Sequence, residues 1–139
     1  MNVSDIMSKH VVTVESDDRL STVKEIFDNA KFHHLLVVED GALFGVVSDR
    51  DLLKSISPNI GTNRYTPRDL ETLNKPVHSV MSRKLLTLRE TASIEDAIAL
   101  FNAHAISCIP IVDADNHILG IMTWRDILKR FHDIAKSMV

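Results

Sequence analysis

The feature that most constrains this chain of 139 residues is an internal duplication. The segment Val3-Ser-Asp-Ile-Met-Ser8 returns 74 residues later as Val77-His-Ser-Val-Met-Ser82. A longer match, 75 residues apart, pairs Gly45-Val-Val-Ser-Asp-Arg-Asp-Leu-Leu-Lys54 with Gly120-Ile-Met-Thr-Trp-Arg-Asp-Ile-Leu-Lys129. Because self-similarity at a fixed spacing marks a repeated structural unit, we expect the same unit to be built twice.

The duplication divides the sequence into two repeats and a linker. The first repeat covers residues 1–55, the linker 56–76 and the second repeat 77–139. Three of the four prolines fall in the linker, and Thr66-Pro67-Arg68-Asp69 predicts the start of a short helix there. An ordered surface loop without a function of its own is the favoured interpretation of the linker. A loop that contacts a partner or covers a ligand is the alternative.

Each repeat shows the same order of expected elements. β-branched and apolar runs predict strands, and apolar side chains at helical spacing predict helices. The expected strands are residues 11–14, 35–38 and 43–47 in the first repeat and 85–88, 109–112 and 118–122 in the second. The expected helices are a short leading helix at 3–7 and 77–81, a longer helix at 20–30 and 94–101, and a last helix beginning after Ser48 and Thr123. Both repeats are therefore predicted to be β-α-β-β-α units of an α/β (α+β-type) fold, and pairing of their sheets is expected to complete one core.

Composition and charge exclude several classes of protein. The apolar fraction of 45% is typical of a globular chain and argues against disorder. The net charge of −3, with scattered lysines and arginines, predicts no binding to nucleic acid. Apolar runs are too short for a membrane span, and no secretory signal is visible at the start of the sequence, so no membrane association is expected. The single cysteine, Cys108, cannot form an internal disulfide, so we expect a cytoplasmic protein.

The last strand of each repeat is followed by the same polar pattern at the start of a helix. Its members are Ser48, Arg50 and Asp51 in the first repeat and Thr123, Arg125 and Asp126 in the second. A helix N-terminus presents unpaired N–H groups and the positive end of the helix dipole, which suits an anion. A carboxylate can accept both hydroxyl protons of a ribose, and arginine can bind phosphate oxygens through two parallel hydrogen bonds. The alternative is that the hydroxyl and the carboxylate only cap the helix.

Other candidate chemistries are weaker. His33 and His34 do not predict a metal site, because adjacent residues of a strand point to opposite faces and no third ligand is evident. Cys108 lies in an expected strand, where a cysteine ordinarily serves as a small buried hydrophobic residue. No nucleophile elbow, Cys/His pair or Walker-type loop is found, and Asp51 and Asp126 are both expected to stay ionised at helix starts. We therefore expect no enzymatic activity.

Taken together and in order, these motifs resemble the CBS domain, the family named after cystathionine β-synthase. The resemblance rests on Asp5-Ile-Met7 and Ser79-Val-Met81, on the strand Ile109-Pro-Ile-Val112, and on the two Gly-h-h-Ser/Thr-x-x-Asp endings, where h is an apolar residue. It implies a tandem CBS pair with pseudo-twofold symmetry that acts as a regulatory module. Such pairs bind AMP, ADP, ATP, S-adenosylmethionine or NAD as regulatory ligands, dimerise through their helices and act on a protein target, here unidentified.

The resemblance also implies two composite ligand sites, each with residues from both repeats. The first comprises Thr13, Phe32, His33, Ile121, Thr123, Arg125 and Asp126, and the second comprises Thr87, Ile106, Ser107, Val46, Ser48, Arg50 and Asp51. Adenine is expected to lie among apolar side chains and to hydrogen-bond to backbone, with the aspartate on the ribose.

The first repeat departs from the family pattern. Leu36 stands where the second repeat has Pro110, and Phe32-His33-His34 replaces Ile106-Ser107-Cys108. The bulky side chains Phe32 and His33 are candidates for stacking on a base. They are also candidates, with Trp124, for filling the sites, which leaves a ligand-independent dimeric interaction module as the alternative function.

Overall fold

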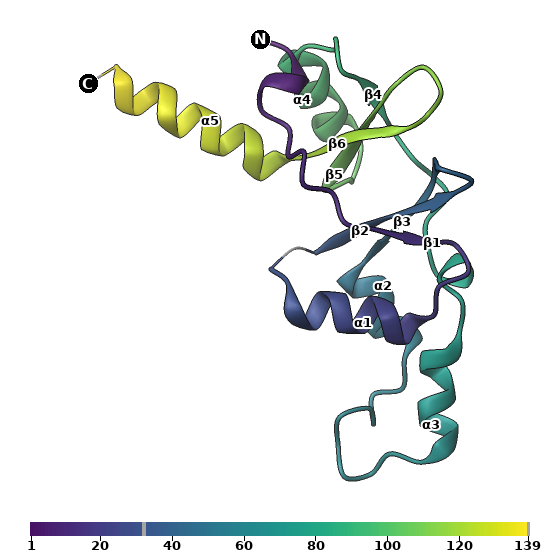
Figure 1. The fold of residues 1–139 in the computed structure, drawn as a ribbon. Helices are drawn as coiled ribbons and strands as arrows, with labels where there is room; N and C mark the ends of the chain where they lie inside the picture. Colours follow the sequence, from purple (N-terminus) through teal and green to yellow (C-terminus); the bar gives the residue numbers. More distant parts are fainter. Residues whose placement is uncertain (32, 139) are drawn as a thin grey trace. The chain divides into compact units, whose positions relative to one another are not determined.

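The structure is a computed structural model that describes residues 1–31 and 33–138. It has the predicted α/β architecture, with two three-stranded sheets of strand order β1-β2-β3 and β4-β5-β6 (Figure 1). The first half contains the 3₁₀ helix η1 (Val3–Asp5), β1 (Thr13–Glu15), α1 (Leu20–Asn29), β2 (His34–Glu39), β3 (Ala42–Ser48) and α2 (Asp49–Ser55). The second half contains η3 (Val77–Ser79), β4 (Leu88–Arg89), α4 (Ile94–Ala103), β5 (Cys108–Val112), β6 (Ile118–Thr123) and α5 (Trp124–Ser137). The expected β-α-β-β-α order is therefore confirmed in both repeats.

The two sheets share one pairing scheme. β1 runs parallel to β2, which forms an antiparallel hairpin with β3, and β4, β5 and β6 repeat this arrangement. Even the irregularity is repeated, because the register shifts between Val37 and Val38 in β2 and between Ile111 and Val112 in β5. The largest differences from the predicted boundaries are in β1 and β4, since most others differ by one or two residues. β1 begins at Thr13 rather than at residue 11, and β4 is only two residues long.

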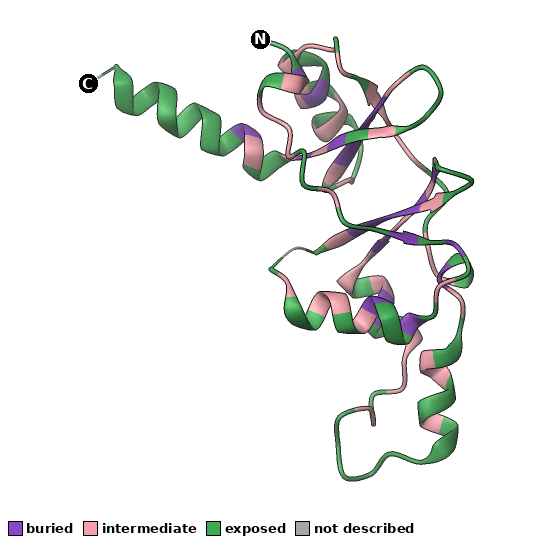
Figure 2. Cartoon of the chain, in the orientation of Figure 1, coloured by how far each residue is buried: buried purple, intermediate pink, exposed green. Residues whose placement is uncertain are grey.

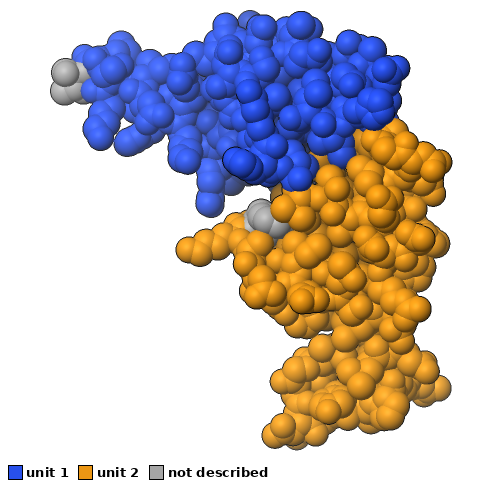
Figure 3. All heavy atoms as spheres, viewed as in Figure 1, with its two compact units in different colours: residues 1–11, 85–139 blue, residues 12–84 orange. Residues whose placement is uncertain are grey.

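The short leading segments are exchanged between the repeats. The chain forms two compact units, residues 12–84 and residues 1–11 with 85–139 (Figure 3). In the discontinuous unit, Ser8 and Ile121 of β6 exchange two backbone hydrogen bonds of 2.9 and 3.0 Å. In the continuous unit, Ser82 and Val46 of β3 do the same at 2.8 and 3.1 Å. The leading segment of the first repeat therefore pairs with β6, the last strand of the second repeat. The leading segment of the second repeat pairs with β3, the last strand of the first repeat.

The two strand glycines permit this close approach. A Cβ at Gly120 would lie 2.6 Å from Sδ of Met7 and 2.8 Å from the backbone oxygen of Ser8. At Gly45 the corresponding atoms are Sδ of Met81 at 2.6 Å and the Ser82 oxygen at 3.0 Å. Neither glycine is therefore a turn residue. They lie inside β3 and β6, where a missing side chain lets another segment pack against the sheet.

Each unit has its own cluster of buried apolar side chains. In residues 12–84 the cluster is Val14, Leu20, Val23, Leu35, Val37, Val47, Leu52 and Val77. In the other unit it is Val3, Ala97, Ile109, Ile111, Met122 and Ile127. Val77 and Val3, from the exchanged leading segments, are completely buried, so each segment completes the core of the unit that it joins. Pairing of the two sheets into one core stays a prediction.

The linker contains the short helix that its sequence predicts, whereas its role stays a prediction. It contains α3 (Pro67–Glu71), followed directly by η2 (Thr72–Asn74), and Thr66 caps α3 with proline at its first position. Asp69 ties the segment together, because its carboxylate accepts hydrogen bonds from the Ser57 hydroxyl at 2.8 Å and the Thr66 N–H at 2.8 Å. Within the described residues, no helix has the length and apolar character needed to cross a membrane.

Candidate functional site

The starts of α2 and α5 carry two matching capping boxes. In such a box, the side chains of the N-cap residue and of the third helical residue each accept a hydrogen bond from the other residue's backbone N–H. The Ser48 hydroxyl accepts from the Asp51 N–H at 3.1 Å, and the Asp51 carboxylate accepts from the Ser48 N–H at 2.9 Å. Thr123 and Asp126 make the same two bonds at 3.3 and 2.8 Å. The predicted N-caps are therefore confirmed, and all four side chains are partly buried.

The box alone does not mark a ligand site. Ser93 and Asp96 form the same box at the start of α4, with both bonds at 3.0 Å. Thr66 and Asp69 form it at the start of α3. The α2 and α5 boxes differ in their surroundings, because each directly follows the last strand of a sheet; the arginine at the second helical position is shared with α3, where it is Arg68. Arg50 and Arg125 are both exposed.

In the continuous unit, the candidate residues gather at one end of the sheet. Thr13 lies opposite Leu36, which lies opposite Val46 on the next strand. At the same end His34 lies opposite Ser48, so His33 is next to the start of α2. The structure therefore brings Thr13, His33, Val46, Ser48, Arg50 and Asp51 to one sheet end, while the Phe32 prediction lies outside the described residues.

The discontinuous unit repeats the arrangement. Ile121 lies opposite Pro110, and Thr123 lies opposite Cys108. Thr87 directly precedes β4, and Ile106 and Ser107 directly precede β5. Within each unit, the structure thus collects residues that the family resemblance assigns to both composite sites. The pairing of residues from different repeats into each site stays a prediction.

Two of the candidate residues have their backbone groups engaged. The N–H and the C=O of Val46 are both bonded to Ser82, and those of Ile121 to Ser8. The N–H groups of both residues therefore already have acceptors, whereas each carbonyl oxygen keeps a second lone pair and each side chain is partly exposed. The sequence contained a signal for this pairing, because the Asp5-Ile-Met7 and Ser79-Val-Met81 motifs and the two glycines recur together.

His33 makes a contact that the sequence did not suggest. Its Nδ1 lies 2.8 Å from Oδ2 of Asp49, and the Asp49 N–H donates to the His33 carbonyl at 3.0 Å. The equivalent positions of the second repeat are Ser107 and Trp124, which have no ionisable side chains to form such a pair. At neighbouring His34, burial lowers the pKa below its usual value, although Asp49 acts in the opposite direction. The two repeats therefore differ in charge at the same place.

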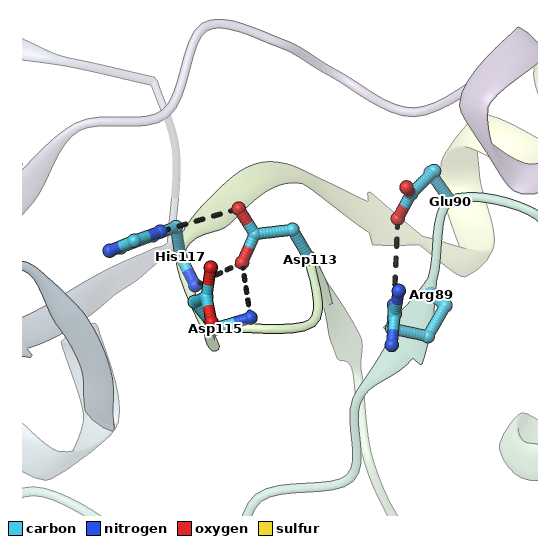
Figure 4. Close-up of polar contacts among 5 residues, drawn as sticks. All are labelled: Arg89, Glu90, Asp113, Asp115 and His117. Carbon is cyan, nitrogen blue, oxygen red and sulfur yellow. Dashed lines mark hydrogen bonds and ion pairs between the residues drawn. The ribbon is translucent and has the colours of Figure 1, made fainter.

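A cluster of possible metal ligands lies outside these groups. Asp113, Asp115 and His117, in the turn between β5 and β6, have ligand atoms within 4.8 Å of one another (Figure 4). The Asp113 carboxylate accepts the backbone N–H groups of Asp115 and His117, both at 2.9 Å. These bonds, with that of His117 first in importance, lower the pKa of Asp113. Formation of the turn explains the cluster, so we assign no metal to it.

Comparison with known proteins gives one family. The CBS domain model matches residues 3–58 and 77–133. Inosine-5'-monophosphate dehydrogenase of Methanocaldococcus jannaschii is 29% identical over 91% of this chain, but the chain spans only 23% of that protein's length. Among solved structures, CBSX2 in complex with AMP is 27% identical, with a TM-score of 0.79 over 96% of this chain and 98% of that one. The CBS domain pair of protein MJ0100, in complex with 5'-methylthioadenosine and S-adenosyl-L-methionine, is 25% identical, with a TM-score of 0.77 over 96% and 97% of the two chains.

Proposed function

Because the chain belongs to the CBS domain family, we propose that it is a regulatory module that binds adenosine-containing ligands and acts without catalysing a reaction. Its similarity to CBSX2 with AMP and to the MJ0100 pair with S-adenosylmethionine supports this ligand class. ADP, ATP and NAD share the adenosine group and belong to the same proposal. The lone cysteine agrees with a cytoplasmic location.

We name the two proposed sites after their aspartates. The Asp126 site comprises Thr13, Phe32, His33, Ile121, Thr123, Arg125 and Asp126, and the Asp51 site comprises Thr87, Ile106, Ser107, Val46, Ser48, Arg50 and Asp51. In each site the aspartate accepts the ribose hydroxyls, and the exposed arginine binds phosphate. The observation that carries the proposal is the identical placement of a Ser/Thr, an Arg and an Asp at the end of the last strand in both units.

The capping bonds make an ordinary alanine variant ambiguous, since it removes a cap as well as a proposed ligand contact. Glutamate at the third helical position also completes a capping box, but its carboxylate is carried one methylene further from the backbone. We therefore expect Asp51→Glu and Asp126→Glu to retain stability and lose affinity. Asp96→Glu is the matched control, because Asp96 occupies the same position in the α4 box and has no proposed ligand role.

The test is thermal unfolding with AMP, ADP, ATP, S-adenosylmethionine or NAD, followed by calorimetric titration of any ligand that raises the midpoint. A ligand at one hundred times its Kd stabilises the fold by about 2.7 kcal/mol, which corresponds to a rise of roughly 3–6 °C. We expect that rise in the wild type and in Asp96→Glu, and a smaller one in the Asp51 or Asp126 variant. A cooperative transition that no adenosine ligand shifts at millimolar concentration contradicts the proposal.

The second candidate is a ligand-independent interaction module with filled sites. The observation in its favour is that the His33 side chain is already engaged by Asp49. This candidate expects a stable dimer whose unfolding midpoint is the same with and without nucleotide, so the same titrations separate the two functions.

We propose further that the chain forms a homodimer through α5. Trp124, Leu128 and Phe131 follow one another at helical spacing and are 49%, 56% and 53% exposed. Figure 2 shows α5 exposed along nearly its whole length beyond the first turns. An apolar stripe of this kind is typical of a helix that packs against another helix, and closed homodimers are the commonest oligomers.

A further inference from the structure

Residues 85–139 hold the first leading segment as they would hold a short peptide. The Val3 N–H donates to the Ala92 carbonyl at 2.8 Å, and Ser8 exchanges its two backbone bonds with Ile121. The Val3 side chain is completely buried. The covalent connection of the segment runs to residue 12, which belongs to the other unit. Hydrogen bonds and packing, rather than a direct chain connection, therefore keep the segment on residues 85–139.

Residues 12–76 hold the second leading segment in the same way. The Val77 N–H donates to the Asp18 carbonyl at 2.7 Å, and Ser82 exchanges two backbone bonds with Val46. This segment continues directly from residue 76 of its own unit, so the first segment is the one that a second chain could replace. We call the residues that receive the segments the docking surfaces, which comprise Ala92, Gly120 and Ile121 in one unit and Asp18, Gly45 and Val46 in the other.

The shared contacts define a common sequence requirement. Both segments read Val-x-x-apolar-Met-Ser, as residues 3–8 and 77–82. Both valines are completely buried, and each methionine sulfur lies 2.6 Å from where a Cβ at Gly120 or Gly45 would be. The two intervening positions, Ser-Asp in one segment and His-Ser in the other, are mostly exposed. Side-chain anchors combined with backbone pairing to a strand are also the means by which strand addition recognises a peptide.

We propose that the docking surface at Ala92, Gly120 and Ile121 recognises a Val-x-x-apolar-Met-Ser peptide, and that a second copy of the chain supplies this peptide at high concentration. The contacts are the same whichever chain supplies the segment, so the two forms differ in the connection through residues 9–12 alone. Exchange of an identical element between protomers is a low-cost route to a dimer. A short connection gives the chain's own segment an effective concentration in the millimolar range, so a second copy competes at about that concentration. The proposal does not depend on nucleotide binding.

Disulfide trapping measures the exchange in the full chain. Ser8→Cys and Ile121→Cys are made separately in a Cys108→Ser background, and one of them is isotope-labelled. Antiparallel residues that exchange two backbone bonds have Cα atoms about 5.5 Å apart, which is within the range of a disulfide. The two variants are unfolded together in urea, refolded at about 1 mM and oxidised by air. We expect mixed covalent dimers in the mass spectrum, and far fewer after refolding at about 10 µM.

The control measures random collisions. Asp17→Cys, at an exposed position of the other unit, replaces Ser8→Cys and is treated in the same way. A yield of mixed dimer that is no higher with Ser8→Cys than with Asp17→Cys contradicts exchange with a second copy.

Val3→Asp tests the specificity of the docking surface. It places a charge at a completely buried position, which stops the chain's own segment from binding. A synthetic peptide of residues 1–11 is expected to raise the unfolding midpoint of this variant by roughly 3–6 °C at one hundred times its Kd. A peptide of residues 77–84 is expected to do the same, whereas the 1–11 peptide with Met7→Asp is expected to have no effect.

The peptide results separate the two parts of the proposal. If the 1–11 peptide stabilises the variant and the 77–84 peptide does not, the common sequence requirement is wrong. If neither peptide stabilises a variant that unfolds cooperatively, the docking surface is not a peptide site. Where Val3→Asp does not fold, Met7→Asp, at a partly buried position, replaces it in the full chain.

Discussion

The backbones of Ser8 and Ile121, 113 residues apart in the sequence, are joined by two hydrogen bonds of 2.9 and 3.0 Å. Ser82 and Val46 are joined in the same way in the other unit. This exchange gives the leading Met motifs a structural role, because Met7 and Met81 lie against Gly120 and Gly45. It also links the segments before the strands to residues of both proposed ligand sites.

Gly120→Ala and Gly45→Ala are expected to destabilise the fold by about 1–3 kcal/mol each, as overpacking does. The added Cβ would be 2.6 Å from a methionine sulfur and no more than 3.0 Å from a backbone oxygen. Urea unfolding measures the change. Adding Met7→Ala to Gly120→Ala should leave the clash with the Ser8 oxygen, so the double variant stays less stable than Met7→Ala alone. A double variant as stable as Met7→Ala would show that the backbone approach is not constraining.

Leu128→Glu and Phe131→Glu are expected to convert the proposed dimer into a monomer, because each places a charge on the exposed apolar stripe of α5. Sedimentation equilibrium measures the mass. Lys129→Glu, on an exposed position of the same helix, is the control and should remain dimeric. A wild type with the mass of a single chain, or a dimer that persists in both stripe variants, contradicts the α5 interface.

The free energy of unfolding is expected to decrease as the pH falls below about 6.5, because His34 becomes protonated more readily in the unfolded chain than in the folded protein. Burial lowers the pKa of His34 in the folded protein, so the unfolded chain binds the proton first. The stabilisation is therefore present above the unfolded pKa and is lost as the pH falls toward the lowered folded value. Chemical unfolding between pH 5 and 8 should show this loss in the wild type and in His117→Gln. If His34→Gln retains the same pH dependence, another group is responsible.

Cys108 is expected to react slowly with thiol reagents. Burial raises the pKa of its thiol from 9.0 to about 11, so at pH 8 the thiolate population falls by about one hundred-fold. Reaction with a disulfide reagent should be slower by about that factor in the folded protein than in urea, where the thiol is exposed. Equal rates in the two states would show that the β5 strand opens readily.

The periodicity of apolar residues in the sequence was sufficient to predict most of the local secondary structure. The strands β2, β3, β5 and β6, the helices α1 and α4 and the caps at Ser48 and Thr123 are all confirmed, because each depends on residues close together in the chain. β4 is shorter than predicted, since its apolar run of residues 85–88 reads as a strand whether or not a partner strand is available. Strand length depends on pairing, which local patterns do not report.

The long-range contacts were harder to predict. Ser8 and Ile121 carry no complementary side chains, and their backbone pairing follows from the whole fold. The His33–Asp49 contact was also missed, because the two residues are 16 positions apart and no local pattern connects the acidic residue beside Ser48 with His33. Ser48, Asp51, Thr123 and Asp126 lie at the helix starts where the motifs predicted them. The ligand-binding role of all the candidate residues depends on the resemblance and stays a prediction.

The exchange of leading segments also sets an order of events during synthesis. Residues 12–84 are contiguous and can form their sheet as soon as they leave the ribosome, whereas residues 1–11 must wait for β6. At translation rates of about 5–20 residues per second, Ser8 waits roughly 6–23 s for Ile121. Through that interval the side chains of Val3 and Met7 have no core to enter, so the segment of residues 1–11 leaves them open to contact with a chaperone.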